Sequence, residues 1–324
     1  MSRLYIAVDG GNSKTDVVIG SSTGAVLGTA SGPGSSPHVL GVPGTVTLLD
    51  SLVRTARAAA GLPLPVVLDR ADVYLAGADL PTEIEVLNKA VGGAGWAREH
   101  RVDNDTFALL RAGTDVPDAV AVVCGAGINC AGRTAGGHSA RFPSLGQISG
   151  DWGGGHHLAE LTLYYAARGE DGRDSATSLS ARVAATLGRA TVAEVSADLH
   201  LGGIPAGRVY ELAPLLFAAA DEGDPVAKRV VARQATEIVS LVRVVAGRLG
   251  LLDADYAVVF GGGVLTARHA LLNDAAAAGI RAHSPRATVS VLEHRPITGA
   301  ALLALDALGA DATADAHLRA ALAT

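Results

Sequence analysis

One short segment constrains the fold of this chain more than any other, and it reads Asp9-Gly10-Gly11-Asn12-Ser13-Lys14-Thr15. An apolar run at residues 4–8 precedes it, and the segment 16–20 that follows is predicted to be a second strand, so the two glycines are predicted to turn a hairpin. Glycine lets the backbone approach a ligand closely, and successive backbone amides form a nest for an anion. A carboxylate at the strand end, Asp9, suits Mg2+. The segment therefore predicts a phosphate-binding turn, with an ordinary Gly-Asn hairpin as the alternative interpretation.

This predicted hairpin differs from two common nucleotide-binding loops. The Walker loop requires Gly-Lys-Ser/Thr leading into a helix, and the Rossmann fingerprint also opens a helix. Here the residues after the glycines are predicted to return as a strand. Neither loop is therefore expected in this chain.

Composition narrows the fold class and the kinds of partner. At 324 residues the chain exceeds the size at which one hydrophobic core keeps growing, which favours two domains. With 49% hydrophobic and 4% aromatic residues, it suits an α/β protein rich in small aliphatic side chains. The formal charge is −6 and no run of Lys and Arg is present, so the sequence does not indicate binding to nucleic acid or to an anionic membrane. Without a signal-peptide pattern or a long apolar stretch, we expect a cytoplasmic protein that acts on small molecules.

The order of predicted elements repeats along the chain. Strands are predicted at residues 3–9, 15–20, 25–30, 72–76 and 99–102, with helices at 44–60 and after Pro81. The order begins again with a strand at 119–123, a glycine turn at 125–127 and a strand at 128–132. A long helix over 225–249 is expected, capped by Asp224 with Pro225 at its first position, and strands at 256–260 and 289–292 follow. The repeated strand-turn units predict two similar domains.

Five elements in this order resemble the superfamily of ATPases that includes sugar kinases, the Hsp70 ATPase and actin. They are Asp9 to Thr15, Asn104-Asp105, Gly125 to Asn129, Gly261-Gly262-Gly263-Val264 and Thr298-Gly299-Ala300-Ala301. The runs DGGNSKT, VDND and GQISGDWGGG are most similar to the BadF/BadG family, whose best-known sugar kinases are N-acetylglucosamine kinases.

The resemblance implies an α/β fold of two actin-like, ribonuclease H-like domains with nucleotide and sugar in the cleft between them. It places residues 1–104 plus 297–324 in an N-terminal domain and residues 105–296 in a C-terminal domain, with a C-terminal helix returning to the first. It also implies ATP and Mg2+ as cofactors, a homodimer, and closure of the domains over the substrates.

Asp105 is the predicted catalytic base. Phosphoryl transfer needs alignment, neutralised phosphate charge and a group that orients or deprotonates the acceptor hydroxyl. Asp105 begins an apolar helical pattern after a short strand, and it matches the position of the family's base. A helix cap formed by Asp103 or Asp105 is the alternative interpretation.

Three glycine turns are predicted to hold the nucleotide. The amides of residues 10–13 and of Gly125-Ala126-Gly127 would hold phosphates, and Lys14 either reaches a phosphate or is a solvated surface charge. Thr15 ends the first turn. Gly261-Gly262-Gly263 resembles the family's adenosine-binding turn, where missing side chains leave room for purine and ribose. A flexible strand-to-helix turn is the alternative for this third segment.

The predicted sugar-binding residues come from several parts of the chain, and they are Ser36, His38, Asn104, Asp105, Asn129, Gln147 and Asp151. Ser36 and His38 stand where related kinases carry an asparagine that reads the sugar, so the acetamido contact stays open. Asp151 matches an acid near the sugar or the metal, although Trp152 and the triple glycine after it depart from the family pattern. Asn129 is either a sugar ligand or a satisfied loop amide.

Two pairs of residues of metal-binding type are not predicted to hold a metal. His156 and His157 lack the cysteine cluster of the zinc-bearing sugar kinases, and one of them is expected to cap or pack at the following helix. Cys124 and Cys130 have neither a disulfide framework nor a zinc-ligand spacing. They are interpreted as small apolar residues near a site.

The leading prediction is ATP-dependent phosphorylation of an amino sugar. The first candidate is N-acetylglucosamine, which would be converted to its 6-phosphate. Another hexose or amino sugar, such as glucosamine or N-acetylmuramic acid, is the nearest alternative. The BadF/BadG family also contains ATPase activators of acyl-CoA dehydratases and reductases, which hold an iron-sulfur cluster between subunits through cysteines. A nucleotide-switched binding module of the Hsp70 or actin type is the third class, and sugar-dependent ATP turnover separates it from a kinase.

Overall fold

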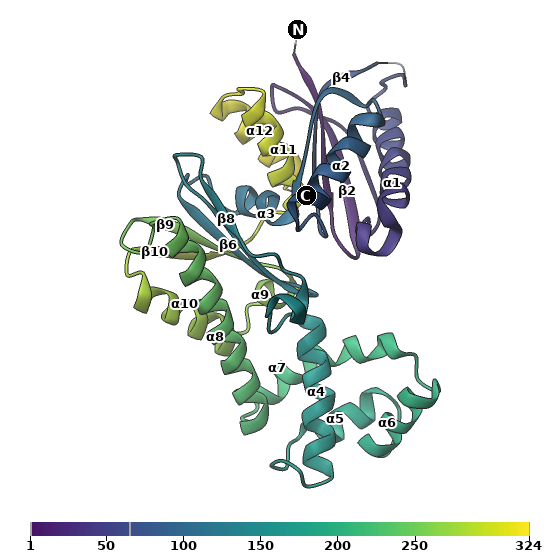
Figure 1. Cartoon of the computed structure of the whole chain (residues 1–324), viewed down its shortest axis with the longest axis vertical. Helices are drawn as coiled ribbons and strands as arrows, with labels where there is room; N and C mark the ends of the chain where they lie inside the picture. Colours follow the sequence, from purple (N-terminus) through teal and green to yellow (C-terminus); the bar gives the residue numbers. More distant parts are fainter. Residues whose placement is uncertain (1, 65, 324) are drawn as a thin grey trace. The chain divides into compact units, whose positions relative to one another are not determined.

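The structure, a computed structural model, describes residues 2–64 and 66–323 (Figure 1). Dense contacts group the chain into two compact units. Unit 1 comprises Met1–Ala121, Ala131–Pro143 and Leu292–Thr324, and unit 2 comprises Val122–Cys130 and Ser144–Val291. The expected domain boundaries at 104/105 and 296/297 rest on the family resemblance rather than on contacts, and they stay a prediction.

Unit 1 is built on a five-stranded sheet with the order β3-β2-β1-β4-β5. The strands are β1 (Leu4–Gly10), β2 (Lys14–Ser21), β3 (Val26–Pro33), β4 (Leu68–Leu75) and β5 (Ala97–Asn104). The first three form an antiparallel meander, and β4 and β5 run parallel to β1. The predicted hairpin is therefore confirmed, and its register sets Asp9 opposite Asp16.

Helices cover both faces of this sheet, because side chains along each strand alternate between two cores. Ile6 and Val8 pack in one core with α1 (Pro37–Ala59) and α2 (Pro81–Gly93). Tyr5 and Ala7 pack in the other with α3 (Asp105–Gly113), α11 (Pro296–Ala307) and α12 (Ala312–Leu322). Figure 1 shows α1 and α2 on one side of the sheet and α11 and α12 on the other. The predicted return of C-terminal helices to the first sheet is confirmed.

The first helix begins earlier than the expected start at residue 44. It begins at Pro37 and contains a kink at Gly41, where φ is 66°, followed by Pro43 inside the helix. Proline has no amide hydrogen and a glycine at positive φ breaks the helical hydrogen-bond ladder, so the sequence pattern shows only the second part. His38 consequently lies in a short helical turn and not in an open loop.

The second sheet has the order β10-β9-β6-β7-β8. Its strands are β6 (Ala119–Cys124), β7 (Ile128–Arg133), β8 (Ser139–Arg141), β9 (Tyr256–Gly261) and β10 (Ala287–Val291). β9 and β10 are parallel, whereas β7 and β8 are antiparallel. The sequence did not predict β8, because three residues are too few for alternation to be recognised.

Apart from β9, β10 and parts of β6 and β7, the secondary structure of unit 2 is helical. Its helices are η1 (Gly146–Ser149), α4 (Gly155–Glu170), α5 (Leu179–Thr186), α6 (Val192–Leu201), η2 (Ala206–Leu212), α7 (Ala213–Asp221), α8 (Pro225–Arg248), α9 (Gly263–Thr266) and α10 (Ala270–His283). The Asp224 carboxylate accepts hydrogen bonds from the amides of Val226 and Ala227, so the predicted cap of α8 is confirmed. Over residues 2–64 and 66–323, no helix combines the length and the apolar character needed to span a membrane.

The helix that carries Asp105 is held from behind by α11. A Cβ atom at Gly299 of α11 would lie 1.8 Å from the carbonyl oxygen of Ala108 and 2.6 Å from the amide nitrogen of Ala112. Both are backbone atoms of α3, so they cannot rotate away. Arg111 of α3, whose side chain is buried, adds an ion pair, with its Nε 2.8 Å from Oδ2 of the exposed Asp306 in α11. The position of α3 therefore depends on the absence of a side chain at residue 299.

Replacing Gly299 by alanine should lower the free energy of unfolding by about 2 to 3 kcal/mol, since the added methyl group meets backbone and forces the two helices apart. Gly93→Ala is the matched control, because a Cβ at Gly93 of α2 meets no atom within 4 Å. That variant should be as stable as the wild type or about 0.5 kcal/mol more stable. Urea unfolding of the two variants provides the comparison, and equal stabilities would contradict the proposed contact.

Candidate functional site

The predicted phosphate turn is packed against the segment that follows β3. A Cβ atom at Gly10 would lie 2.3 Å from Ser35 Oγ, and one at Gly34 would lie 2.0 Å from the Asn12 carbonyl oxygen. The Ser35 amide donates to the Gly11 carbonyl at 3.1 Å. Residues 12–14 of the turn are exposed, whereas Thr15 is fully buried. A side chain at residue 34 would meet backbone, and one at residue 10 would meet the Ser35 and Leu75 side chains. Close packing therefore favours glycine at both positions, a reason that the sequence pattern did not reveal.

Asp9 lies at the end of β1 among charged groups. Burial, then the nearby carboxylates of Asp105 and Asp16, raise the pKa of Asp9 to about 8, although Arg295 and Lys14 oppose the shift. Its ionised form is therefore disfavoured unless a further cation lies beside it. The arrangement fits the predicted Mg2+ ligand.

Asp16 was not predicted as a site residue, although its position on β2 opposite Asp9 follows from the register of a two-residue hairpin. It lies 2.7 Å from a guanidinium nitrogen of Arg295 and 3.1 Å from the Lys14 ammonium, and it accepts a hydrogen bond from Ser31. Burial alone would raise the pKa of Asp16, but these hydrogen bonds outweigh it and hold the pKa below its ordinary value. Asp16 is therefore the ionised neighbour of Asp9.

Asp105 is the first residue of α3, and it is partly buried. The helix cap is Asn104, whose Oδ1 accepts from the Thr106 amide at 3.0 Å, so neither Asp103 nor Asp105 provides the N-cap. Burial and the nearby Asp79 raise the pKa of Asp105 to about 7. A carboxylate with this pKa can accept a proton near neutral pH.

Asn104, Ser36 and His38 differ in their accessibility. Asn104 is 1% exposed, and its Nδ2 donates to Asp79 Oδ1 at 2.8 Å. Ser36 is also buried, and its carbonyl accepts from the amides of Val39 and Leu40. The His38 side chain is half exposed, and its Nε2 lies 3.0 Å from Glu83 Oε1. The sugar-binding role of all three stays a prediction, and only His38 presents much of its side chain at the surface of unit 1.

In unit 2, the glycine turn at residues 125–127 is held by the glycines that precede α4. The Gly155 amide donates to the Gly125 carbonyl at 2.6 Å, and the His156 amide donates to the Ala126 carbonyl at 3.0 Å. A Cβ atom at Gly154 would lie 2.5 Å from the Gly127 carbonyl carbon. The triple glycine 153–155, which departs from the family pattern, thus packs its backbone directly against the predicted phosphate turn.

Three side chains support the backbone of residues 153–155. Gln234 of α8 is fully buried, and its Oε1 accepts from the Gly154 amide at 3.1 Å. His157 Nδ1 accepts from the Gly153 amide at 2.9 Å, and the His157 ring meets Trp152 edge-on at 5.1 Å. The prediction that one of the two histidines caps or packs at this helix is confirmed. Gln234 was not predicted, and its sequence signal is a polar residue within the apolar stripe of an amphipathic helix.

The third glycine turn is close to the same backbone. Gly262 has a φ of 81°, and its Cβ would lie 2.5 Å from the Cys124 carbonyl carbon and 2.6 Å from the Gly125 amide nitrogen. Gly261 is buried at the end of β9, whereas Gly263 is exposed at the start of α9. The turns at 125–127 and 261–263 are therefore neighbours within unit 2.

The remaining predicted residues of unit 2 are Asn129, near the start of β7, Gln147 in η1, and Asp151, which follows η1. The Asp151 carboxylate accepts from the Gly146 amide at 2.9 Å and from Ser149 Oγ at 2.7 Å, which closes the turn that carries the exposed Gln147. Asn129 Oδ1 accepts from the Cys130 amide at 2.7 Å. The Asn129 bond agrees with the alternative interpretation of a satisfied side-chain amide, although Asn129 lies in a strand and not in a loop. The sugar-binding assignments of Asn129 and Asp151 stay predictions.

Cys124 and Cys130 are free and fully buried. Burial raises the pKa of the Cys124 thiol to about 12 and the pKa of the Cys130 thiol still higher. Metal and cluster ligation requires the thiolate, and sharing a cluster between subunits requires sulfur at the surface. The geometry therefore agrees with the interpretation of both residues as small apolar side chains.

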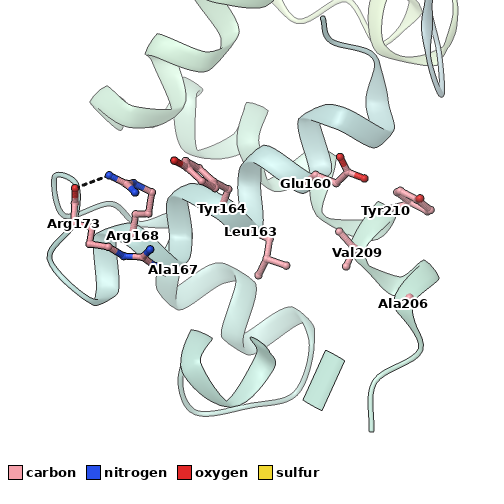
Figure 2. Close-up of a pocket in the computed structure, with 9 residues that line it drawn as sticks. All are labelled: Glu160, Leu163, Tyr164, Ala167, Arg168, Arg173, Ala206, Val209 and Tyr210. Carbon is pink, nitrogen blue, oxygen red and sulfur yellow. Dashed lines mark hydrogen bonds between the residues drawn. The ribbon is translucent and has the colours of Figure 1, made fainter. Parts of the chain in front are cut away.

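A cavity of about 460 Å³ lies in the helical part of unit 2, between α4 and η2 (Figure 2). Tyr164, Leu163 and Val209 form apolar parts of its wall, and Arg168 donates to the Arg173 carbonyl at 2.9 Å. None of the predicted site residues lines it. His156, which bonds the glycine turn, stacks on the lining residue Tyr210 with ring centroids 3.8 Å apart.

Comparison with known proteins identifies relatives along nearly the whole chain. Residues 6–304 match the model of the BadF/BadG/BcrA/BcrD ATPase family. N-acetyl-D-glucosamine kinase of Dictyostelium discoideum is 24% identical over 326 residues, which cover 94% of this chain and 98% of that protein. N-acetylmuramic acid/N-acetylglucosamine kinase of Clostridium acetobutylicum is 25% identical over 190 residues, which cover 59% of this chain and 62% of the relative.

A solved structure shows the same fold. It is a candidate N-acetylglucosamine kinase from Chromobacterium violaceum, which is similar with a TM-score of 0.70 and 21% identity over 93% of this chain and 98% of that chain. Together with the two five-stranded sheets, this likeness confirms the predicted α/β fold of the actin-like ATPases.

The raised pKa of Asp105 makes a prediction about stability. An acid whose pKa is higher in the folded state stabilises the fold below its unfolded pKa of about 4, and this contribution is lost as the pH rises through about 7. Asp105→Asn removes the ionisation. Its stability relative to the wild type should therefore increase by about 2 kcal/mol between about pH 5 and about pH 8. Urea unfolding at both pH values measures this, with the exposed Asp274→Asn as control; a constant difference at both pH values would contradict it.

Proposed function

Because the chain belongs to the BadF/BadG/BcrA/BcrD ATPase family, we propose that it transfers the terminal phosphoryl group of ATP to an amino sugar, N-acetylglucosamine first, forming the 6-phosphate. The observation that carries this proposal is Asp105, a partly buried carboxylate at a helix start whose pKa is raised to about 7. General bases work best when their pKa lies near the working pH. The Dictyostelium and Clostridium relatives, which are named as kinases of N-acetylglucosamine and N-acetylmuramic acid, support the class of sugar.

Asp105 would accept the proton of the attacking hydroxyl. The Asn104 cap and the packing of α3 on Gly299 hold its backbone in place, so little reorganisation is needed when the hydroxyl approaches. The Asp79 carboxylate helps to keep Asp105 a stronger base than an exposed aspartate.

Asp9 would hold Mg2+, directly or through water. Burial and the carboxylates of Asp105 and Asp16 raise the pKa of Asp9 to about 8, so a cation beside Asp9 would stabilise its charged form. Bound there, Mg2+ would supply charge neutralisation for the phosphates of ATP. Asp16, held ionised by Arg295 and Lys14, would provide a second carboxylate near this position.

We propose that the glycine turns at residues 10–13 and 125–127 hold phosphate oxygens through backbone amides, and that residues 261–263 accept the adenosine. Lys14 is paired with Asp16 at 3.1 Å, so a contact between Lys14 and a phosphate would require it to leave that pair. Among the proposed sugar ligands, His38 and Gln147 have the most exposed side chains. A cytoplasmic location and a homodimer belong to the same proposal.

Purified protein with MgATP should release ADP in a sugar-dependent manner, and N-acetylglucosamine should stimulate the release most strongly. The panel comprises N-acetylglucosamine, glucosamine, N-acetylmannosamine, N-acetylmuramic acid, glucose and no sugar, with product identity checked by mass. Stimulation by a different sugar would keep the reaction and change the substrate. An ADP release rate that is the same with every sugar and without sugar would exclude a kinase of this class.

Asp105→Asn should lower kcat by at least about 1,000-fold while ATP binding stays within about 2-fold, because a base that acts on the hydroxyl contributes to the transition state. In the wild type, kcat/KM for the sugar should fall as the pH falls through about 7, where Asp105 becomes protonated. The exposed Asp274→Asn should leave both properties unchanged. Turnover by Asp105→Asn at the wild-type rate would remove Asp105 from this role.

A further inference from the structure

Glu83, in the first turn of α2, contacts both His38 and the turn that precedes α2. Its Oε2 accepts hydrogen bonds from the amides of Asp79 at 3.0 Å and Leu80 at 2.8 Å. Its Oε1 lies 3.0 Å from Nε2 of His38. One carboxylate therefore fixes the turn that precedes α2 and, at the same time, the ring of His38.

The same turn is bonded to the helix that carries Asp105. The Asp79 carboxylate accepts from Asn104 Nδ2 at 2.8 Å, and Asn104 Oδ1 accepts from the Thr106 amide at 3.0 Å. Asp79 is 8% exposed and Asn104 is 1% exposed, so water competes little for these bonds. Hydrogen bonds thus connect His38, Glu83, Asp79 and Asn104 to the first turn of α3.

The close approach of His38, Asp79 and Glu83 has a second interpretation, a metal site, because one ligand-type atom of each lies within 4.8 Å of the others. Hydrogen bonds already account for this approach. Each oxygen of Glu83 has a protein partner, and the Asp79 Oδ1 atom faces the amide of Asn104. The group is therefore better described as a hydrogen-bonded network than as a metal site.

We propose that Glu83 is a positioning residue that holds the sugar-contacting ring of His38 and the base Asp105 at a fixed separation. This inference rests on the proposed sugar kinase function. A glutamate at this place in a helix is commonly a capping residue that only stabilises the first turn. What distinguishes Glu83 is that its second oxygen is used by a half-exposed histidine, and that the backbone it caps leads to Asp105.

The chain contains a matched control for capping alone. In α6 the Thr191 side chain accepts from the Glu194 amide, and Glu194 Oε2 accepts from the Ala190 amide at 2.9 Å. Glu194→Ala therefore removes a comparable capping carboxylate from unit 2, where it contacts none of the proposed site residues. Glu83→Gln is the conservative variant, since glutamine also caps from this position.

Glu83→Ala should lower kcat/KM for N-acetylglucosamine by at least about 10-fold, through both kcat and KM, while KM for ATP stays within about 2-fold. Glu83→Gln should recover activity to within about 3-fold of the wild type, and Glu194→Ala should stay within about 2-fold. His38→Ala combined with Glu83→Ala should cost less than the product of the single effects, since both act through one contact. Wild-type kinetic constants in Glu83→Ala would reduce Glu83 to a helix cap and overturn the inference.

A second measurement separates this inference from the proposed function. Hydrogen–deuterium exchange of the proteins without substrate should show faster exchange at residues 79–80 and 104–108 in Glu83→Ala, but not in Glu83→Gln or Glu194→Ala. Unchanged exchange at 104–108 in Glu83→Ala would show that the network does not reach α3. If the wild type instead lacks sugar-dependent turnover, the proposed function fails and the sugar-positioning role of Glu83 fails with it, while the exchange result still decides whether Glu83 supports α3.

Discussion

Two carboxylates face each other across one pair of strands in unit 1, and their proximity requires positive charge nearby. The hairpin register places Asp9 opposite Asp16, and like charges in such a pair repel. Lys14 and Arg295 supply positive charge, and Arg295 lies immediately before α11. That helix in turn packs on α3 through Gly299, and α3 begins with Asp105. Charge balance at the end of β1 and the placement of the proposed base are therefore connected through α11.

In unit 2 the main constraint is the close packing of backbone against backbone around the turn at residues 125–127. The turn at residues 125–127 accepts hydrogen bonds from the start of α4, and Gly154 and Gly262 lie so close to it that no side chain fits. Buried Gln234 then bonds the Gly154 amide from α8. A phosphate-binding turn works through amide groups in fixed positions, and such positions require a rigid support rather than particular side chains.

Much of the fold was accessible to prediction, and the errors have physical reasons. The hairpin at residues 10–13, the strands that follow it and the capped helix α8 were predicted correctly, because periodicity and cap residues are local signals. The early start of α1 was missed because a glycine and a proline interrupt its pattern. Asp16, Gln234 and the triple glycine were missed as parts of the site, because their partners are distant in sequence or consist of backbone atoms.

The order of residues along the chain is enough to identify the available chemistry: carboxylates at the end of β1 and at the start of α3, three glycine turns, and two cysteines without a ligand spacing. These follow from local order along the chain, which hydrophobic periodicity and residue type encode directly. Folding sets how strongly each acid holds its proton and which glycines support a turn, and it connects Glu83 both to His38 and to the helix of Asp105. Those properties depend on burial and on contacts between distant segments, and these exist only once the chain has folded.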